Sequence, residues 1–315
     1  MKVAIAGGSG FIGRHLVRHI VKGGGEVIVL SRNPERARRS ETGGGRHGDR
    51  VRFVSWQEAE DQPNWCEGVD AFVNLAGETI NRRWTRAGKQ LILDSRVEAV
   101  RRMKRIIERL DAKPRVVISG SGISYYGRSE QDEFDEKSPS VAGPDDFLAT
   151  VCQHWEKEAE AIQSARVVRL RIGLVLGTDG GALPKMMLPF QFGLGGKIGS
   201  GQQWMSWIHI ADMVRLIDFC MQNETISGPV NATAPHPVRN ETFVRTLGEG
   251  LRRPTVIPLP AALLRAVLGE MATLLLDGQR VIPRVMLDHG FSFRFPHLHD
   301  ALADLMGTDA SPSRI

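Results

Sequence analysis

The feature that most constrains this chain is a glycine-rich segment close to its N-terminus. A short apolar run, Lys2–Ala6, leads into the sequence GGSGFIG at 7–13, and apolar residues then recur at helical spacing as far as Ile20. Between a strand and a helix, glycines allow a tight turn, a close approach of the backbone to a ligand, and close packing of the helix on the strand. Free N–H groups at the start of a helix favour an anion, so this order of elements predicts a dinucleotide site. The residues predicted to contact the dinucleotide here are Gly7, Ser9, Gly10, Phe11, Ile12 and Gly13.

Strand-like and helix-like segments alternate over the first half of the chain. Helical patterns cover about 85–110 and 145–163. The predicted strands are Lys2–Ala6, Glu26–Leu30, Arg50–Trp56, Ala71–Leu75, Arg115–Ser119 and Arg166–Arg171. This alternation is typical of an α/β fold with a doubly wound parallel sheet of the Rossmann type.

The composition of the sequence changes after Gly173, where glycine and proline become frequent. We therefore expect a Rossmann domain over residues 1–173, with later segments interleaved into it, and a smaller C-terminal lobe over residues 174–315. A cleft between two such parts is the default place for a small-molecule substrate. A second glycine-rich stretch, Glu41–Gly48, predicts a mobile loop.

The composition argues against several classes of function. The 315-residue chain carries a net charge of +5, and positive charge is concentrated in residues 32–50 and 96–115. Aromatic residues are not interleaved with these charges as in nucleic-acid modules, so we interpret them as solvated surface and expect no nucleic-acid partner. No apolar run is long enough for a membrane span, and the run Val3–Ala6 is too short for a secretory signal. Three widely spaced cysteines without metal-ligand spacing indicate a reducing compartment and no metal site. We expect the cytoplasm, with an organelle matrix as the alternative.

The residues after the second predicted strand bear on the choice of cofactor. NAD enzymes usually place Asp or Glu there to bind the ribose 2′-hydroxyl, whereas this chain has Ser31 and Arg32. Ser31 can donate a hydrogen bond to a 2′-phosphate, and Arg32 can form a bidentate pair with it. The sequence therefore favours NADP (NADPH when reduced) over NAD. The alternative is that Arg32 is only a surface residue.

Longer motifs are spread along the whole chain. They are VNLAGE at 73–78, SGSGISYYG at 119–127, RIGLVLG at 171–177, GGKIGSGQQWMSWIHIAD at 195–212, GPVNATAPHPV at 228–238 and LDHGFSFRFPHLHDAL at 287–302. Together with the glycine turn they resemble the extended short-chain dehydrogenase/reductase superfamily, which includes the nucleotide-sugar epimerases. In detail they resemble an atypical, epimerase-like branch that carries a C-terminal domain of unknown function.

The resemblance implies further cofactor contacts at the carboxyl edge of the sheet. The turn after the fourth predicted strand would line the adenosine and ribose side, and the ends of the fifth and sixth strands would lie beside the nicotinamide. The residues it assigns to the cofactor site are Leu75, Ala76, Gly77, Glu78, Arg96, Ser119, Gly120, Arg171, Ile172 and Gly173. The residue type at 77 also fits on its own, because a bulky side chain there would block a close approach of the backbone to a ligand.

The catalytic pair typical of that superfamily, Tyr-x-x-x-Lys, is missing from the helix predicted after the fifth strand. One register of this helix places Cys152 and Glu156 at the two positions, and the register shifted by one residue places Gln153 and Lys157 there. Neither register restores the tyrosine that would move a proton during hydride transfer.

Two residues remain as candidates for catalysis. Ser121 matches the residue that in this superfamily hydrogen-bonds the reacting carbonyl, and a hydroxyl group by itself stabilises a transition state only modestly. Tyr125 lies in the loop after the fifth strand and could lean into the cleft. The neighbouring Tyr126 is better explained as a structural residue.

Two functions are therefore compatible with the sequence. The first is an NADP(H)-dependent oxidoreductase or epimerase-like enzyme (an epimerase is an isomerase) that acts on a small substrate, with a nucleotide sugar as one candidate. The second is a noncatalytic NADP(H)-binding protein that reports redox state to a partner. The sequence fixes neither the substrate nor the oligomeric state, and it is compatible with a homodimer.

Overall fold

A computed structural model describes residues 1–41 and 48–307, so most of the predicted loop Glu41–Gly48 lies outside the described residues. Contacts divide the chain into two compact units whose segments alternate along the sequence. The first unit comprises Met1–Tyr125, Phe147–Arg171 and Val214–Val230, and the second comprises Tyr126–Asp146, Ile172–Met213 and the chain from Asn231 onward. The domain division at residue 173 stays a prediction, but one later segment clearly belongs to the first unit.

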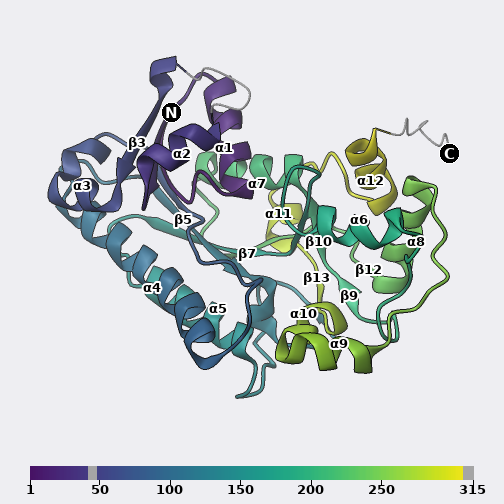
Figure 1. The fold of residues 1–315 in the computed structure, drawn as a ribbon. Coiled ribbons are helices and arrows are strands. Elements are labelled where there is room, and N and C mark those ends of the chain that lie inside the picture. Colours follow the sequence, from purple (N-terminus) through teal and green to yellow (C-terminus); the bar gives the residue numbers. More distant parts are fainter. Residues whose placement is uncertain (42–47, 308–315) are drawn as a thin grey trace. The chain divides into compact units, whose positions relative to one another are not determined.

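A seven-stranded sheet is the framework of the first unit (Figure 1). The strands are β1 (Lys2–Ala6), β2 (Glu26–Ser31), β3 (Val51–Ser55), β4 (Ala71–Asn74), β5 (Val116–Gly122), β7 (Arg166–Ile172) and β11 (Gly228–Ala232). Their order is β11-β7-β5-β4-β1-β2-β3, and the pairs β1–β2, β2–β3, β1–β4 and β4–β5 are parallel. Because the order proceeds in opposite directions on the two sides of β1, this is the doubly wound sheet that the sequence predicts. The predicted fold class is confirmed.

Helices connect these strands. They are α1 (Phe11–Lys22), α2 (Pro34–Glu41), α3 (Trp56–Asp61), α4 (Arg86–Arg109), α5 (Phe147–Glu160) and α7 (Ile210–Gln222), with short 3-10 turns η1 (Gly48–Arg50), η2 (Pro63–Cys66) and η3 (Ile123–Tyr126). The side chains of Val3, Ala4 and Ile5 in β1 have no exposed surface, as expected for a parallel strand with both faces covered. Helices α4 and α5 lie side by side, and residues of α4 such as Met103 and Ile107 are fully buried (Figure 1).

The second unit is built from short elements. They are β6 (Glu133–Phe134), β8 (Leu174–Leu176), α6 (Leu183–Gln191), β9 (Trp204–Met205), β10 (Trp207–His209), β12 (Val238–Arg239), α8 (Asn240–Leu251), α9 (Ala261–Leu268), η4 (Gly269–Ala272), α10 (Thr273–Leu276), β13 (Arg280–Val281), α11 (Arg284–Asp288) and α12 (Leu298–Met306). The strands pair two by two, as β10–β8, β12–β9 and β13–β6. Trp207, Phe243 and Leu247 are fully buried at its centre.

Two general properties of the described chain bear on function. No helix within residues 1–41 and 48–307 combines the length and the apolar character that a membrane crossing requires. Within the same residues, no three His, Cys, Asp or Glu side chains gather in an arrangement that could hold a metal ion.

Candidate functional site

The glycine turn between β1 and α1 is fixed by contacts that exclude side chains. Gly7 has a φ of +79°, and a Cβ atom there would lie 2.7 Å from the Leu75 carbonyl carbon at the end of β4. A Cβ on Gly13 would lie 2.2 Å from the Gly7 carbonyl oxygen. Gly10 differs from both, because a Cβ there would meet only the Gly7 oxygen, at 3.1 Å. Gly7 and Gly13 therefore serve the packing of the protein itself, whereas Gly10 leaves space open in front of the helix.

The N-terminus of α1 is left without the groups that usually satisfy it. Gly10 is the N-cap residue and offers no side-chain cap, and the first turn contains no acidic residue. Ser9 and Gly10 are exposed, and Phe11 and Ile12 are half-buried. The first N–H groups of a helix have no partner within the helix, so here they can donate to an anion. A pyrophosphate group fits this open, uncapped helix start.

The end of β2 presents an exposed cation. The Arg32 side chain is 80 % exposed, and its Nη1 lies 3.5 Å from Glu78 Oε2. Ser31 Oγ accepts a hydrogen bond from the Asn33 N–H at 3.1 Å. Because an exposed ion pair of this length contributes little stability, Arg32 can turn towards a stronger anion.

The last residue of β4, Asn74, is a buried amide at the start of the turn that the resemblance assigns to the adenosine and ribose side of the cofactor. Asn74 is fully buried, and its Oδ1 accepts a hydrogen bond from the Ala76 N–H at 3.1 Å. Its Nδ2 has no hydrogen-bond partner among the described residues. The predicted contact residues Leu75 and Ala76 are half-buried beside it. A buried amide donor needs an acceptor, so this Nδ2 is available to a ligand at the carboxyl end of β4.

In the structure, the glycine at 77 also lies against a side chain of α4. A Cβ there would lie 3.1 Å from the Arg96 guanidinium carbon, so the residue makes room for this side chain. Arg96 Nη1 donates to the carbonyl oxygens of Glu78 and Ile92, at 3.0 and 2.9 Å. Ser95 Oγ accepts from the Glu78 N–H at 2.9 Å. Arg96 and Ser95 on α4 thus hold the turn after β4 in place, and a cofactor contact by Arg96 stays a prediction.

The carboxyl end of β5 is closely packed. The strand continues to Gly122, three residues beyond the predicted end at Ser119, so Ser121 lies on the strand itself. Ser119 is 1 % exposed. A Cβ on Gly120 would lie 3.0 Å from both the Asn74 carbonyl oxygen and the Trp155 ring, which explains a glycine at this position.

The two predicted catalytic residues lie close to a buried ion pair. Ser121 Oγ donates a hydrogen bond to Glu156 Oε1 at 2.8 Å. Arg171 donates to the same carboxylate through Nε at 2.8 Å and Nη2 at 2.9 Å, and both side chains are 3 % exposed. The Tyr125 ring covers the Arg171 guanidinium at 3.5 Å from its centroid. Arg169 Nη1 lies 3.5 Å from Glu156 Oε2. This cluster was not predicted, because Glu156 and Arg171 come from different elements.

Helix α5 shows which of the two predicted registers for the missing catalytic pair points into the protein. Cys152 and Glu156 on α5 are buried, whereas Gln153 and Lys157 are exposed. Burial raises the pKa of the Cys152 thiol to about 11, and the Glu156 charge adds to this effect. Cys152 is therefore a protonated thiol at neutral pH and not an activated nucleophile.

Two of the predicted cofactor residues at the end of β7 belong to the second unit. Ile172 is half-buried, and Gly173 packs so tightly that a Cβ would lie 2.5 Å from the Ser206 carbonyl oxygen and 2.8 Å from a Thr233 methyl group. Packing within this unit accounts for Gly173. The predicted cofactor contacts of both residues stay predictions.

Tyr126, also in the second unit, is fixed by contacts with other side chains of that unit. It is fully buried, its hydroxyl donates to Asn231 Oδ1 at 2.8 Å, and its ring stacks on Phe134 with centroids 5.1 Å apart. These contacts account for the residue without a catalytic role.

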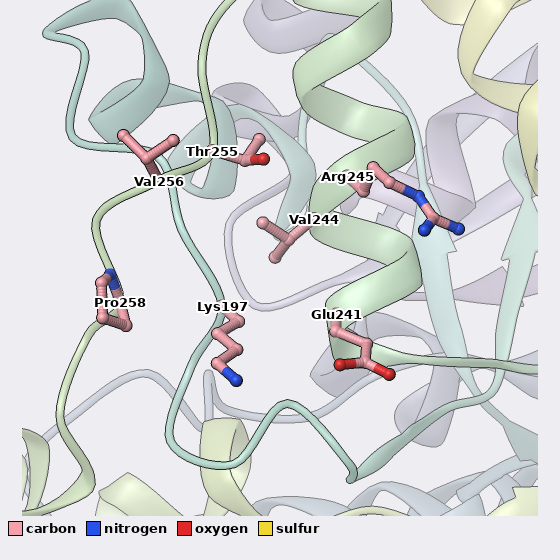
Figure 2. Close-up of a pocket in the computed structure, with 7 residues that line it drawn as sticks. All are labelled: Lys197, Glu241, Val244, Arg245, Thr255, Val256 and Pro258. Carbon is pink, nitrogen blue, oxygen red and sulfur yellow. The ribbon is translucent and has the colours of Figure 1, made fainter.

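A separate hollow of about 340 Å³ lies within the second unit, between α8 and the segments around Lys197 and Thr255 (Figure 2). Lys197 and Glu241 lie at one end of it, and Val244 and Val256 lie further along. No residue of the predicted catalytic or cofactor sets lines this hollow.

Comparison with known proteins agrees with the fold and with the glycine turn. Residues 3–232 match the NAD dependent epimerase/dehydratase family. The chain belongs to this family. Residues 259–305 also match a domain of unknown function, DUF1731, which confirms the resemblance to the branch with such a domain.

The relatives cover the chain almost completely. Epimerase family protein YfhF of Bacillus subtilis is 38% identical over 97% of this chain and 98% of its own length. The chloroplastic SDR39U1 homolog of Arabidopsis thaliana, also an epimerase family protein, is 40% identical over 97% of this chain and 87% of its own. The crystal structure of the human epimerase family protein SDR39U1 (isoform 2) with NADPH superposes with a TM-score of 0.86 at 37% identity, and it covers 98% of this chain and 99% of the human chain.

Proposed function

We propose that this protein binds NADP(H) across the start of α1 and the end of β2, and that it acts as an epimerase-like oxidoreductase on a small substrate. Nucleotide sugars are the first class of substrate to test. The site for the reaction is the carboxyl end of β5, with Ser121 and Tyr125 as the residues nearest to the chemistry. We place the protein in the cytoplasm, which is supported by its three free, buried cysteines.

The observation that carries the cofactor proposal is the exposed guanidinium of Arg32. It stands at the end of the strand that follows the glycine turn, where a 2′-phosphate would be recognised. Its contact with Glu78 is long and exposed, so a phosphate can displace it. The human relative crystallised with NADPH supports the same cofactor.

The cofactor proposal is tested by calorimetric titration of the wild-type protein with NADPH and NADH. A hydrogen bond to a charged group contributes about 1.5–3 kcal/mol, so NADPH is expected to bind at least about tenfold more tightly. Arg32→Asp should abolish or reverse this preference. Arg38→Asp is the matched control, because Arg38 is also an exposed arginine of the first unit, with 59% of its side chain exposed. Equal affinities of the wild type for the two cofactors would refute the role of Arg32.

A second candidate function is supported by the residues at the positions of the usual catalytic pair. Cys152 is a buried protonated thiol, and Glu156 is bonded to Arg171 and Ser121. Neither can replace the usual tyrosine and lysine in their usual roles. The protein would then bind NADP(H) without turnover and report its redox state to a partner.

The two candidates are separated by incubating the NADP⁺-loaded protein with a panel of nucleotide sugars. An oxidoreductase should form reduced nicotinamide, seen by its absorbance, or an epimerised sugar, seen by NMR. Loss of this turnover in Ser121→Ala, with NADPH affinity unchanged, would assign the chemistry to the end of β5. Tight NADPH binding with no turnover of any sugar would favour the noncatalytic candidate.

A further inference from the structure

The hydrogen bond between Ser121 and Glu156 has a defined direction. A carboxylate can only accept hydrogen bonds, and the Glu156 carboxylate accepts two from the N–H groups of Arg171, at 2.8 and 2.9 Å. The hydroxyl of Ser121 must therefore be the donor in its 2.8 Å bond to Glu156. A serine hydroxyl has one proton and two lone pairs, so this bond uses its only proton.

The surroundings of Ser121 keep this direction fixed. Glu156 and Arg171 are each 3 % exposed, so water does not compete for the pair, and Tyr125 covers the guanidinium. The thiol of Cys152 also faces Ser121, and burial keeps this thiol protonated. A thiol is at most a weak donor, so at least one lone pair of Ser121 is left for a ligand. Ser121 itself retains 4 % of its surface exposed.

We infer that Ser121 presents a lone pair, not a proton, to the substrate, so that the site recognises the hydroxyl group of an alcohol in preference to a carbonyl oxygen. This inference deepens the proposed function and rests on it for the place of the substrate. Glu156 and Arg171 are positioning residues here, because they act through Ser121. The inference departs from the sequence-based expectation that this serine donates to a reacting carbonyl.

The preference for an alcohol over a ketone depends on Ser121 and not on the cofactor. An acceptor such as a ketone oxygen would meet the serine lone pairs and gain no hydrogen bond, whereas an alcohol would donate one. The difference between a satisfied and an unsatisfied polar contact in a buried site corresponds to about a tenfold change in affinity. The same preference is therefore expected with and without bound NADP⁺.

The test uses cyclohexanol and cyclohexanone, which have nearly the same shape but differ in their ability to donate. Both are titrated by saturation-transfer NMR into the full-length protein, with and without NADP⁺. The alcohol should bind about tenfold more tightly than the ketone in the wild type. In Ser121→Ala the ratio should fall to about one, because the accepting oxygen is gone.

Two further variants separate the direction of the hydrogen bond from a merely structural role. In the double variant Glu156→Met, Arg171→Met, Ser121 can turn its proton outward, so the ketone should gain affinity and the ratio should approach one. Replacing a buried ion pair by apolar residues of similar size is often tolerated, so this variant should fold. Cys152→Ala is the matched control and should keep the preference of the wild type.

Several results would overturn the inference. They are a ketone that binds the wild type as tightly as the alcohol, a preference that survives in Ser121→Ala, and an absence of binding by both probes. A failure of NADP⁺ to bind would refute the proposed function instead, and the titrations without cofactor would still decide the direction of the bond.

Discussion

The start of α1 and the end of β5 both belong to the first unit, but their polar groups are arranged in opposite ways. At the start of α1 and the nearby end of β2, the helix has no side-chain cap and the Arg32 side chain is 80 % exposed. At the end of β5, Ser121, Glu156 and Arg171 are buried and bonded to one another. The first region has hydrogen-bonding capacity left for a large anionic ligand. In the second region the protein has already used most of this capacity, including the only hydroxyl proton of Ser121.

This comparison predicts a large difference in stability between the two regions. Arg171→Met leaves the Glu156 carboxylate buried without its two N–H donors, which should lower the free energy of unfolding by about 3–5 kcal/mol. Arg32→Met removes a similar side chain from the exposed region and should change it by less than about 0.5 kcal/mol. Denaturant unfolding of both variants measures the difference. Similar losses in the two would show that the buried pair is no more important to the fold than a surface arginine.

The buried region at the end of β5 should also make the free energy of unfolding decrease at alkaline pH. The pKa of the Cys152 thiol is raised by burial from 9.0 to about 11, so the folded state keeps a proton that the unfolded state loses. This contribution is complete below about pH 9 and is lost as the pH rises towards about 11, by at most about 3 kcal/mol. Cys152→Ala should make the decrease of unfolding free energy over this range less steep.

The matched control for the alkaline effect is Val151→Ala, which removes buried volume from the same helix without removing a titrating group. It should lower stability by a similar amount at every pH. An identical pH dependence in Cys152→Ala and the wild type would contradict the assignment.

Substitutions of two glycines in the turn between β1 and α1 should have different effects, one on stability and the other on NADPH affinity. Gly13→Ala places a methyl group 2.2 Å from the Gly7 oxygen and should cost about 1–3 kcal/mol of stability. Gly10→Ala meets the same oxygen only at 3.1 Å, so stability should change by less than about 1 kcal/mol. NADPH affinity should nevertheless fall in Gly10→Ala, because the methyl group enters the space in front of the helix. Calorimetry and denaturant unfolding together test this, and unchanged NADPH binding in Gly10→Ala would place the phosphates elsewhere.

The open region could be predicted from sequence, and the buried cluster could not, for a physical reason. The glycine turn is local: a strand, three spaced glycines and a helix follow one another, and each constrains the next. The ion pair joins α5 to β7 in space, and nothing in the sequence around Glu156 shows that Arg171 will face it. The helical register of Glu156 was one of two that the sequence allowed. Its partner became visible only when the order of β5 and β7 in the sheet was known.

Two other features could not be predicted for the same reason, because they depend on segments that are distant in sequence. The sequence indicates the glycine at 77 as room for a ligand, and the structure adds a neighbour distant in sequence, because a Cβ there would lie 3.1 Å from the Arg96 guanidinium carbon. The seventh strand, β11, joins the sheet beside β7 from a part of the chain that its glycine and proline content assigned to the C-terminal lobe. Local composition describes a segment but does not state which sheet it joins.

The smallest effect expected from the comparison concerns Glu78. Its carboxylate competes with the proposed 2′-phosphate for Arg32. Glu78→Gln removes the competing negative charge, so NADPH should bind about two- to fivefold more tightly, while NADH binding stays unchanged. Stability should change by less than about 0.5 kcal/mol, because the pair is exposed and 3.5 Å long. Glu35→Gln is the control, since Glu35 forms a similar exposed pair with Arg38 at 3.8 Å. If Glu78 instead contacts the cofactor directly, as the family resemblance implies, the variant should weaken NADPH and NADH equally. Calorimetry with the two cofactors therefore decides whether Glu78 restrains Arg32 or binds the cofactor itself.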